Sequence, residues 1–351
     1  MSTPVSTPTA TLSPTVTPTP TPTPLPTKED TDKDGFSDYF EENIAHTDPN
    51  VPNDRYAILV DTMEKPDAWQ IAIFYDVLTH DVSTGTNTGQ IFKLRFEKEN
   101  IRILVPEEEI PCEDPALPEG TIIPTWENFK KAVSEIAQKV DKNDLVYIEL
   151  TGHEVLAKST NEAGLKFIDG DHSWEEINEV IDKINCRALI ITVDCCHTDL
   201  TVLDPLKRGS SPRILGTQTS SGEIAHSGEF GRLFLGAYTT PEVGDCCCYP
   251  SWIDPDTNQN GYLSVKEAFD YAIRRERRLS KPIGNCPPVH PQVYDSDNIA
   301  SEIYLSEFYS VDQIARVLNK DQIERMFGDR DAAERWKDLL TEEKGYKLRW
   351  Y

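Results

Sequence analysis

The chain is 351 residues long and carries 60 acidic against 35 basic side chains, so its formal net charge is −25 at neutral pH. Proteins that bind nucleic acid or anionic membranes need basic surfaces, so this balance argues against both roles and favours cation binding and basic partners. No apolar run approaches the roughly 18 residues that a membrane-spanning helix needs. Hydrophobic residues make up 38% of the chain, enough for the buried core of one large domain or two ordinary ones.

Residues 1–27 form a tail unlike the rest of the chain, with ten threonines, eight prolines and no charged side chain. The Thr-Pro repeat from Thr17 to Pro24 favours an extended, polyproline-like spacer, so we expect a disordered stalk. The tail lacks the basic start and apolar stretch of a secretory signal. Thr/Pro-rich stalks are typical of exported proteins, and this composition favours a secreted or cell-surface location.

The next segment, residues 28–52, contains the twelve-residue pattern of a calcium-binding loop, D-x-[DN]-x-[DN]-G-x5-E. This spacing wraps oxygen ligands around one hard cation, and glycine at the sixth position allows the sharp turn. The predicted ligands are Asp30, Asp32, Asp34, the carbonyl of Phe36, Asp38 and Glu41. With Thr47-Asp48-Pro49-Asn50 after it, the loop resembles the calcium repeats of thrombospondin type 3 and dockerin-like segments. The resemblance implies Ca2+ as the cofactor and a stiffened junction between stalk and domain.

Residues 53–308 alternate short apolar segments with amphipathic helices, which predicts an α/β fold with a mostly parallel sheet and helices on both faces. The segment 188–193 (ALIITV) is almost continuously apolar, as expected of a strand covered on both sides. The expected strands span residues 55–61, 101–106, 144–150, 188–193 and 213–219, and the expected helices span residues 68–78, 126–140 and 174–184.

Two chemically reactive residue types follow neighbouring strands of this predicted sheet. The third strand is followed by Gly152-His153, and the fourth by Asp194-Cys195-Cys196. Functional groups gather at the carboxyl ends of parallel strands, and a thiol becomes a nucleophile when a nearby imidazole takes its proton. The pattern therefore predicts a thiol nucleophile with its base. Either residue alone has a simpler interpretation, as a hydrogen-bonded histidine or a small buried cysteine.

Gly152-His153 after DLVYIELT, followed by IITVDCCHT, resembles the caspase-fold cysteine peptidases, nearest the metacaspase and legumain-like branches. The resemblance covers residues 55–305 and implies a caspase-like sheet of about six strands, the last of them near Pro291–Asp295. It implies an endopeptidase that works through a thioester acyl-enzyme. By this resemblance Cys196 is the nucleophile, His153 is the general base, and the N–H groups of Gly152 and Cys196 stabilise the oxyanion.

The resemblance also places Asp194 where metacaspases line the pocket for the substrate side chain before the cleaved bond. A carboxylate there favours Arg or Lys, so we expect peptide substrates with a basic residue at that position. Asp61, at the end of the first strand, is a candidate second carboxylate, although a hydrogen-bonded strand end is the simpler interpretation. Lys207 and Arg208 are candidate self-cleavage sites or ordinary surface residues.

Two positions depart from the family pattern. Glu154 stands where a glycine usually follows the histidine, and Thr198-Asp199 stands in place of Ser-Gly. A carboxylate beside the site is expected to disturb the oxyanion backbone and to raise the thiol pKa. An alternative function is therefore a catalytically inactive, calcium-stabilised surface module on a Thr/Pro stalk. Cys195 is an alternative nucleophile, but strand alternation turns its side chain away from that of Cys196.

A second stretch, residues 256–267, fits the calcium pattern inside the domain. Its predicted ligands are Asp256, Asn258, Asn260, the carbonyl of Tyr262, Ser264 and Glu267. With two carboxylates against five in the first loop, it is expected to bind calcium less tightly, and its place in the chain suggests a role in ordering the substrate cleft.

The remaining segments are less informative. Residues 309–351 are expected to form a charged, helical carboxyl-terminal segment. The cysteines include no CxxC pair, which argues against a zinc site. Cys246, Cys247 and Cys248 are expected to be thiols, with one bridge to Cys286 as the alternative.

Overall fold

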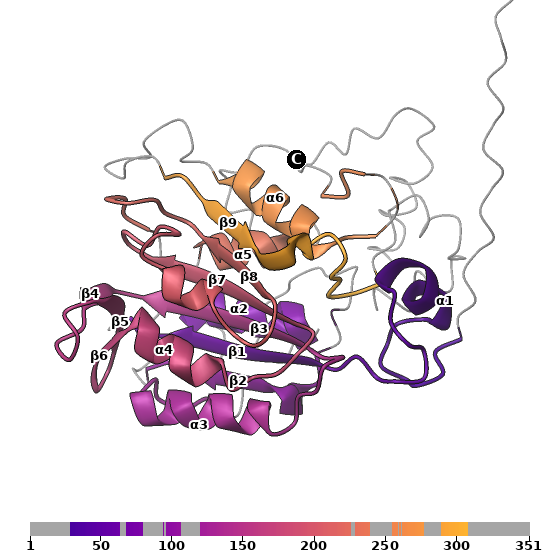
Figure 1. Ribbon diagram of the computed structural model, residues 1–351, viewed down its shortest axis with the longest axis horizontal. Coiled ribbons are helices and arrows are strands. Elements are labelled where there is room, and N and C mark those ends of the chain that lie inside the picture. Colours follow the sequence, from indigo (N-terminus) through magenta and orange to yellow (C-terminus); the bar gives the residue numbers. More distant parts are fainter. Residues whose placement is uncertain are drawn as a thin grey trace, which may run out of the picture.

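The computed structural model describes residues 29–63, 68–79, 94, 96–106, 120–225, 229–238, 255–258, 260, 262–276 and 289–307. The Thr/Pro tail, the helices expected in 309–351, and the cysteines at 112, 246–248 and 286 lie outside the described residues. Within them the fold is α/β, with a six-stranded sheet between two layers of helices (Figure 1).

The central sheet has the strand order β2-β1-β3-β7-β8-β9, and every neighbouring pair is parallel except β8 and β9. Its strands are β1 (Arg55–Asp61), β2 (Ile101–Leu104), β3 (Leu145–Gly152), β7 (Ala188–Cys195), β8 (Arg213–Thr217) and β9 (Gln292–Asp295). Strands β1, β3, β7 and β8 are buried along their whole length because helices cover both faces. The predicted mostly parallel, six-stranded sheet is confirmed.

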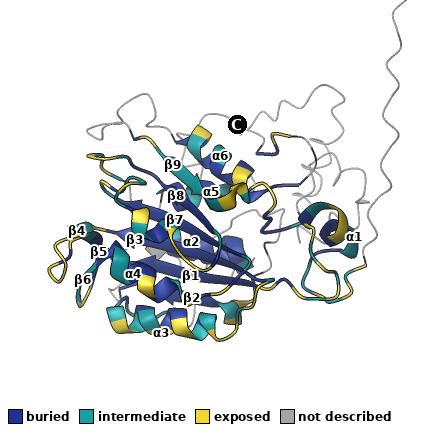
Figure 2. Ribbon diagram, viewed as in Figure 1, coloured by how far each residue is buried: buried dark blue, intermediate teal, exposed yellow. Residues whose placement is uncertain are grey.

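Each face of the sheet packs against its own set of helices. Helices α2 (Ala68–Thr79), α5 (Glu229–Gly236) and α6 (Val265–Arg275) cover one face, and α3 (Trp126–Ala137) and α4 (Trp174–Ile181) cover the other. Figure 2 shows the strands buried and exposed residues on the outer sides of α3, α4 and α6, whereas the described side chains of α2 are mostly buried. Phe234 of α5 stacks on Phe269 of α6 with ring centroids 4.4 Å apart, which ties these two helices together. None of the described helices is long and apolar enough to cross a membrane.

The ends of several elements differ from the sequence-based expectation. Helix α3 stops at Ala137 because the chain tightens into a turn, in which Lys139 N donates to Ile136 O at 2.9 Å. Strand β3 runs two residues further than expected, to Gly152, because Thr151 and Gly152 still pair with Asp194 and Cys195 of β7. This extension brings the residues after both strands to matching positions.

A second, antiparallel sheet follows β3, and the sequence pattern does not predict it. Its strands, in the order β4-β5-β6, are β4 (Glu154–Leu156), β5 (Ala163–Phe167) and β6 (Gly170–Ser173). They are three to five residues long, so the alternation of Ala163, Leu165 and Phe167 in β5 is too short a pattern to predict a strand. A side chain at Gly164 would lie 1.9 Å from the His172 carbonyl oxygen, so the β5–β6 pairing requires glycine there.

Candidate functional site

The first acidic loop forms a tight turn held by its own carboxylates. Asp34 N donates to Asp32 Oδ1 at 3.2 Å, Phe36 N to Asp34 Oδ1 at 2.7 Å, and Gly35 N to Asp30 Oδ2 at 3.2 Å. Gly35 has a φ of 94°, a left-handed conformation that glycine adopts without strain. The glycine at the sixth position of the pattern therefore makes the turn, as predicted.

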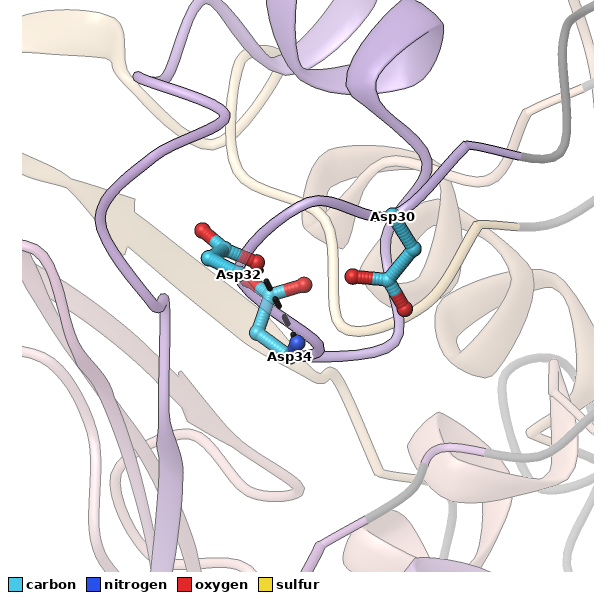
Figure 3. Close-up of side chains that lie close together, drawn as sticks. All are labelled: Asp30, Asp32 and Asp34. Carbon is cyan, nitrogen blue, oxygen red and sulfur yellow. Dashed lines mark hydrogen bonds between the residues drawn. The ribbon is translucent and has the colours of Figure 1, made fainter.

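This turn brings three carboxylates to one point. Oxygen atoms of Asp30, Asp32 and Asp34 lie within 4.8 Å of one another, and Figure 3 shows Asp30 across the turn from the other two. Asp30 Oδ1, Asp32 Oδ2 and Glu41 Oε2 are buried oxygens without a hydrogen-bond partner among the described residues. Such oxygens are costly to bury, and a coordinated cation supplies the missing partner. The residues present therefore fit a hard divalent cation.

Glu41, the last residue of the pattern, has no exposed surface. Burial, and then the charges of Asp34 and Asp32, raise the pKa of this carboxyl to about 8. The pKa of Asp32 is also raised, first by burial and then by Asp34. The loop thus concentrates more negative charge than its surroundings stabilise, which is the electrostatic condition that favours a bound cation.

Asp38 plays a different part from the other predicted ligands. Its two oxygens accept from Thr31 N and Thr31 Oγ1, both at 2.8 Å, and so tie the start of the loop to its end. The ninth position of such loops often reaches calcium through a water molecule, which fits this arrangement. Asp30, Asp32, Asp34 and Glu41, with the Phe36 carbonyl, are the residues that would hold the ion.

The loop is fixed to the domain through aromatic contacts. It continues into α1 (Asp38–Phe40) and a π-helical turn, η1 (Glu41–Ala45). Phe36 and Phe40 join Tyr262 and Tyr304 in one buried cluster, where the Phe40 ring centroid lies 5.1 Å from that of Tyr262. Ser37 N and Oγ donate to Glu307 at 2.9 and 2.8 Å. Ser37 and Phe40 thus contact segments that lie more than 200 positions further along the chain.

The second predicted loop repeats part of this geometry. Asn260 N donates to Asn258 Oδ1 and Tyr262 N donates to Asn260 Oδ1, both at 2.8 Å. Glu267, unlike Glu41, uses both oxygens within the chain: Thr257 N donates to Oε1 at 3.1 Å, and Ser264 Oγ donates to Oε2 at 2.9 Å in the capping box of α6. Calcium binding by Asp256, Asn258, Asn260, Tyr262, Ser264 and Glu267 stays a prediction.

The second loop lies beside the first loop, because Tyr262 packs on Phe40. The first loop leads into the amino end of β1, so this region is at the sheet edge opposite the Cys–His edge. This position argues against the expectation that calcium in the second loop orders the substrate cleft. Sequence order alone could not reveal this position of the second loop, because the length of α6 separates the loop from the carboxyl edge of the sheet.

The Cys–His edge is built by the pairing of β3 with β7. Gly152 lies opposite Cys195 in this parallel pair, so His153 and Cys196 follow at matching positions. His153 is exposed and Cys196 is half-buried. Cys195 is fully buried, with Sγ 4.0 Å from the Leu150 carbonyl oxygen, and burial raises its pKa well above the usual value. Cys196 is therefore the better placed of the two cysteines to act as a nucleophile.

Three threonines fix the turn that follows Cys196. The hydroxyls of Thr198 and Thr219 donate to the Cys195 carbonyl oxygen at 2.8 and 3.0 Å, and Thr217 Oγ1 donates to the Thr198 carbonyl oxygen at 2.8 Å. The threonine that departs from the family pattern thus has a structural role. His197, which lies between Cys196 and Thr198 in the chain, has a backbone φ of 61°, in the left-handed region.

The two predicted substrate-binding carboxylates are buried. Asp194 is 1% exposed and accepts from the first turn of α5, from Phe230 N at 3.3 Å and Gly231 N at 2.9 Å. Asp61 is also 1% exposed and accepts from Met63 N at 2.8 Å. The simpler strand-end interpretation describes Asp61 well. A pocket role for either residue stays a prediction.

Glu149 is a buried residue that the sequence reasoning missed. It has no exposed surface, accepts from Tyr147 Oη at 2.8 Å and Thr151 Oγ1 at 2.9 Å, and hydrogen-bonds Asp194. Burial raises the pKa of both carboxyl groups, which favours a proton shared between them. A charged residue inside the apolar run DLVYIEL was the available signal.

Gly152 and Glu154 flank His153. A Cβ atom on Gly152 would lie 2.1 Å from Thr62 Oγ1, so close packing already requires glycine there. The predicted oxyanion role of Gly152 and of the Cys196 N–H remains a prediction. Glu154 begins β4, and its pKa is raised, mainly by burial, despite the opposing effect of His197.

The predicted self-cleavage residues belong to an ordered segment. Lys207 ends the short 3-10 helix η4 (Asp204–Lys207), and its Nζ lies 3.5 Å from Asp204 Oδ1. Arg208 pairs with Glu175 at 2.7 Å and is exposed. Cleavage at either position would require this turn to open locally, and it stays a prediction.

Comparison with known proteins supports the calcium loop. Residues 30–52 match the bacterial TSP3 repeat, a repeat of the calcium-binding type. No curated protein matches the chain. A crystal structure of the protein GSU0716 from Geobacter sulfurreducens is similar, with a TM-score of 0.40 and 10% identity, over 73% of this chain and 99% of that chain. The repeat match and the orphaned carboxylate oxygens agree on calcium binding by residues 30–41.

We predict that Glu41→Gln weakens calcium binding, whereas Glu42→Gln, on the exposed neighbour, does not. Losing one charged ligand oxygen should cost about 1.5–3 kcal/mol, or roughly ten- to hundredfold in Kd. Calorimetric titration with calcium chloride measures both variants. Calcium at about 1,000 times Kd should also stabilise the wild-type protein by roughly 4 kcal/mol, and excess chelator should abolish this gain. Equal Kd values for the two variants would remove Glu41 from the site.

We also predict that the Glu149–Asp194 pair makes the protein less stable as pH rises. Raised pKa values mean that the folded state keeps a proton that the unfolded chain releases near pH 4, so this stabilisation is complete at low pH and is lost through the folded-state pKa. In the Glu149→Gln variant, an amide N–H takes the place of the shared carboxyl hydrogen, and the amide does not titrate. Urea unfolding from pH 5 to 9 in saturating calcium should show a flatter profile for this variant, by up to about 1.4 kcal/mol per pH unit. Parallel profiles for Glu149→Gln, the exposed control Glu162→Gln and wild type would contradict the shared proton.

Proposed function

We propose that the protein is a calcium-stabilised cysteine endopeptidase of caspase-like fold. The observation that carries the proposal is the β3–β7 register, which sets His153 and Cys196 at matching positions on the carboxyl edge of two neighbouring central strands. The exposure of His153 and the partial exposure of Cys196 support it, because a peptide bond must reach both. The five parallel strands and the antiparallel edge strand β9 are compatible with the caspase-like expectation.

In the proposed reaction, His153 takes the proton of the Cys196 thiol, and the thiolate attacks the carbonyl carbon of the scissile peptide bond. The N–H groups of Gly152 and Cys196 would stabilise the negative oxygen of the tetrahedral intermediate. Protonated His153 then gives its proton to the leaving amine, which leaves a thioester on Cys196. A water molecule, deprotonated by His153, hydrolyses this thioester and restores the thiol.

The threonine network supports a fixed position for the nucleophile. Thr198 and Thr219 both bond the carbonyl of Cys195, which immediately precedes Cys196. Because the bonded residues are themselves buried, this turn cannot rearrange without losing several hydrogen bonds. Such preorganisation favours catalysis, since the reacting groups need little movement.

Cleavage after Arg or Lys remains part of the proposal, on the basis of Asp194, Asp61 and the family resemblance. Both carboxylates lie on the α5 side of the sheet edge, where Asp61, Thr151 and Asp194 are in register across three strands. Asp194 already accepts two N–H groups of α5, so it would contact a substrate side chain only if the first turn of α5 shifts. Self-processing near Lys207 and Arg208 is a further part of this proposal.

The position of the calcium loop argues for a stabilising role. The first loop contacts the amino end of β1, whereas His153 and Cys196 follow the carboxyl ends of β3 and β7. The ion would therefore hold the repeat and the second loop in place without touching the substrate. The second loop is proposed as a weaker site of the same kind.

An inactive, calcium-stabilised binding module is the second candidate function, and Glu154 favours it. This carboxyl directly follows His153, is half-buried and has a raised pKa, mainly because of burial. In its ionised form it would disfavour the Cys196 thiolate.

The two functions predict different results with fluorogenic peptides that end in Arg, Lys or Asp. For the peptidase, wild-type protein in calcium cleaves the basic peptides, and Cys196→Ala or His153→Ala lowers kcat/KM at least about a thousandfold. Cys195→Ala is the matched control and should keep activity, because Cys195 is buried away from the edge. No cleavage by folded wild-type protein would favour the binding module. Activity that survives Cys196→Ala would exclude this nucleophile.

A further inference from the structure

Asn53 is a buried residue beside the calcium loop that neither the twelve-residue pattern nor the matched repeat includes. It is 2% exposed and stands two residues before the first residue of β1. Its backbone N donates to Asp34 Oδ2 at 2.9 Å, and its side-chain Nδ2 donates to Glu41 Oε1 at 2.8 Å and to Asp34 Oδ2 at 3.2 Å. One amide therefore joins the fifth and the last positions of the loop.

These bonds leave one oxygen of Glu41 for an ion. Oε1 accepts from Asn53 and from Thr47 Oγ1, whereas Oε2 is buried without a hydrogen-bond partner among the described residues. Both oxygens of Asp34 are oriented by N–H groups, since Oδ2 accepts from Asn53 and Oδ1 accepts from Phe36 N. A neutral amide can orient both carboxylates without adding the positive charge that would compete with a cation. Partners of this kind fix the direction of metal ligands and raise their affinity.

The same short segment joins the loop to the sheet. Arg55, the first residue of β1, donates through Nη2 to the Asp34 carbonyl oxygen and through Nη1 to the Leu305 carbonyl oxygen at 3.2 Å. Its guanidinium carbon lies 4.5 Å from the centroid of the Phe36 ring. The backbone N of Asp54, which lies between Asn53 and Arg55, donates to Asp144 Oδ1 at 2.9 Å. Residues 53–55 therefore hydrogen-bond the calcium loop on one side and the rest of the domain on the other.

We propose that Asn53 is a positioning residue for calcium in the first loop, and that it makes calcium binding and docking of the repeat onto the sheet one coupled event. The inference rests on calcium binding by the first loop and is independent of the peptidase proposal. If Asn53 must be in place for tight binding, the bound ion must in turn stabilise the segment that carries Asn53, because coupling between two equilibria is reciprocal.

Calorimetric titration of the full chain with calcium chloride tests the positioning role. Asn53→Ala removes Nδ2 and should weaken calcium binding about ten- to hundredfold, the cost typical of losing an outer-shell partner. Asn50→Ala is the matched control, since Asn50 is exposed and donates to Asp48, which is not a predicted ligand, and the Kd of this variant should stay within about twofold of wild type. A variant that is unfolded in chelator still gives a result, because the calcium midpoint of its folding, followed by circular dichroism, replaces Kd.

The outcomes separate this inference from the assignment of calcium itself. A wild-type Kd for Asn53→Ala, with thermal stability lowered equally in calcium and in chelator, would mean that Asn53 is only structural. Absence of calcium binding by the wild-type protein would instead overturn the calcium site on which the inference rests. Hydrogen–deuterium exchange tests the coupling: calcium should slow exchange both in residues 30–41 and in residues 53–60 of wild type. Protection confined to residues 30–41 would overturn the coupled docking.

Discussion

Five carboxylates lie in one twelve-residue turn, and the fold buries one of them completely. Glu41 has no exposed surface, and Asp30 and Asp32 each keep a buried oxygen that has no hydrogen-bond partner in the described part of the chain. Charges of one sign in such a place repel each other and lose their hydration, so the arrangement favours a bound cation. Three sets of contacts require this turn to keep its shape. They are the aromatic cluster around Phe40, the hydrogen bonds from Ser37 to Glu307, and the hydrogen bond from Arg55 to the Asp34 carbonyl oxygen.

The sheet separates the calcium loop from the Cys–His edge. Parallel strands put all their amino ends at one edge and all their carboxyl ends at the other. The calcium loop precedes β1 and contacts the first edge, while His153 and Cys196 follow β3 and β7 at the second. Helix α6 bridges this distance: it starts beside the second loop and ends next to Glu276, whose carboxylate accepts from Gln218 after β8 at 2.8 Å. In the proposed function, calcium would therefore stabilise the domain, whereas peptide cleavage would depend on the turn after Cys196.

Much of this architecture follows from the sequence, for identifiable reasons. Continuous apolar runs such as 188–193 marked the buried strands, and the spacing of Asp30, Asp32, Asp34 and Glu41 marked the ion site, because both patterns are local. The small sheet β4-β5-β6 escaped prediction because its strands are three to five residues long and depend on the close approach at Gly164. Asn53 and Glu149 also escaped it. Their partners are set by the folded chain, so no motif connects Asn53 to Glu41 or Glu149 to Asp194.

The buried partners also change the interpretation of residues that the sequence did single out. Asp194 was expected to line a substrate pocket, but its oxygens accept from the first turn of α5. Thr198 was a departure from a family pattern, and it proves to hold the carbonyl beside Cys196. In both cases a long-range neighbour decides the role, and such neighbours come from the fold and not from the local sequence.

The central claim is that the first loop gathers its carboxylates around one calcium ion. Crystals of the full chain grown with calcium chloride, and an anomalous difference map from them, test it most directly. The account predicts a peak about 2.3–2.6 Å from oxygens of Asp30, Asp32, Asp34 and Glu41, the distance range of calcium ligands. A map with no peak in this loop, from protein shown by calorimetry to be saturated with calcium, would contradict it.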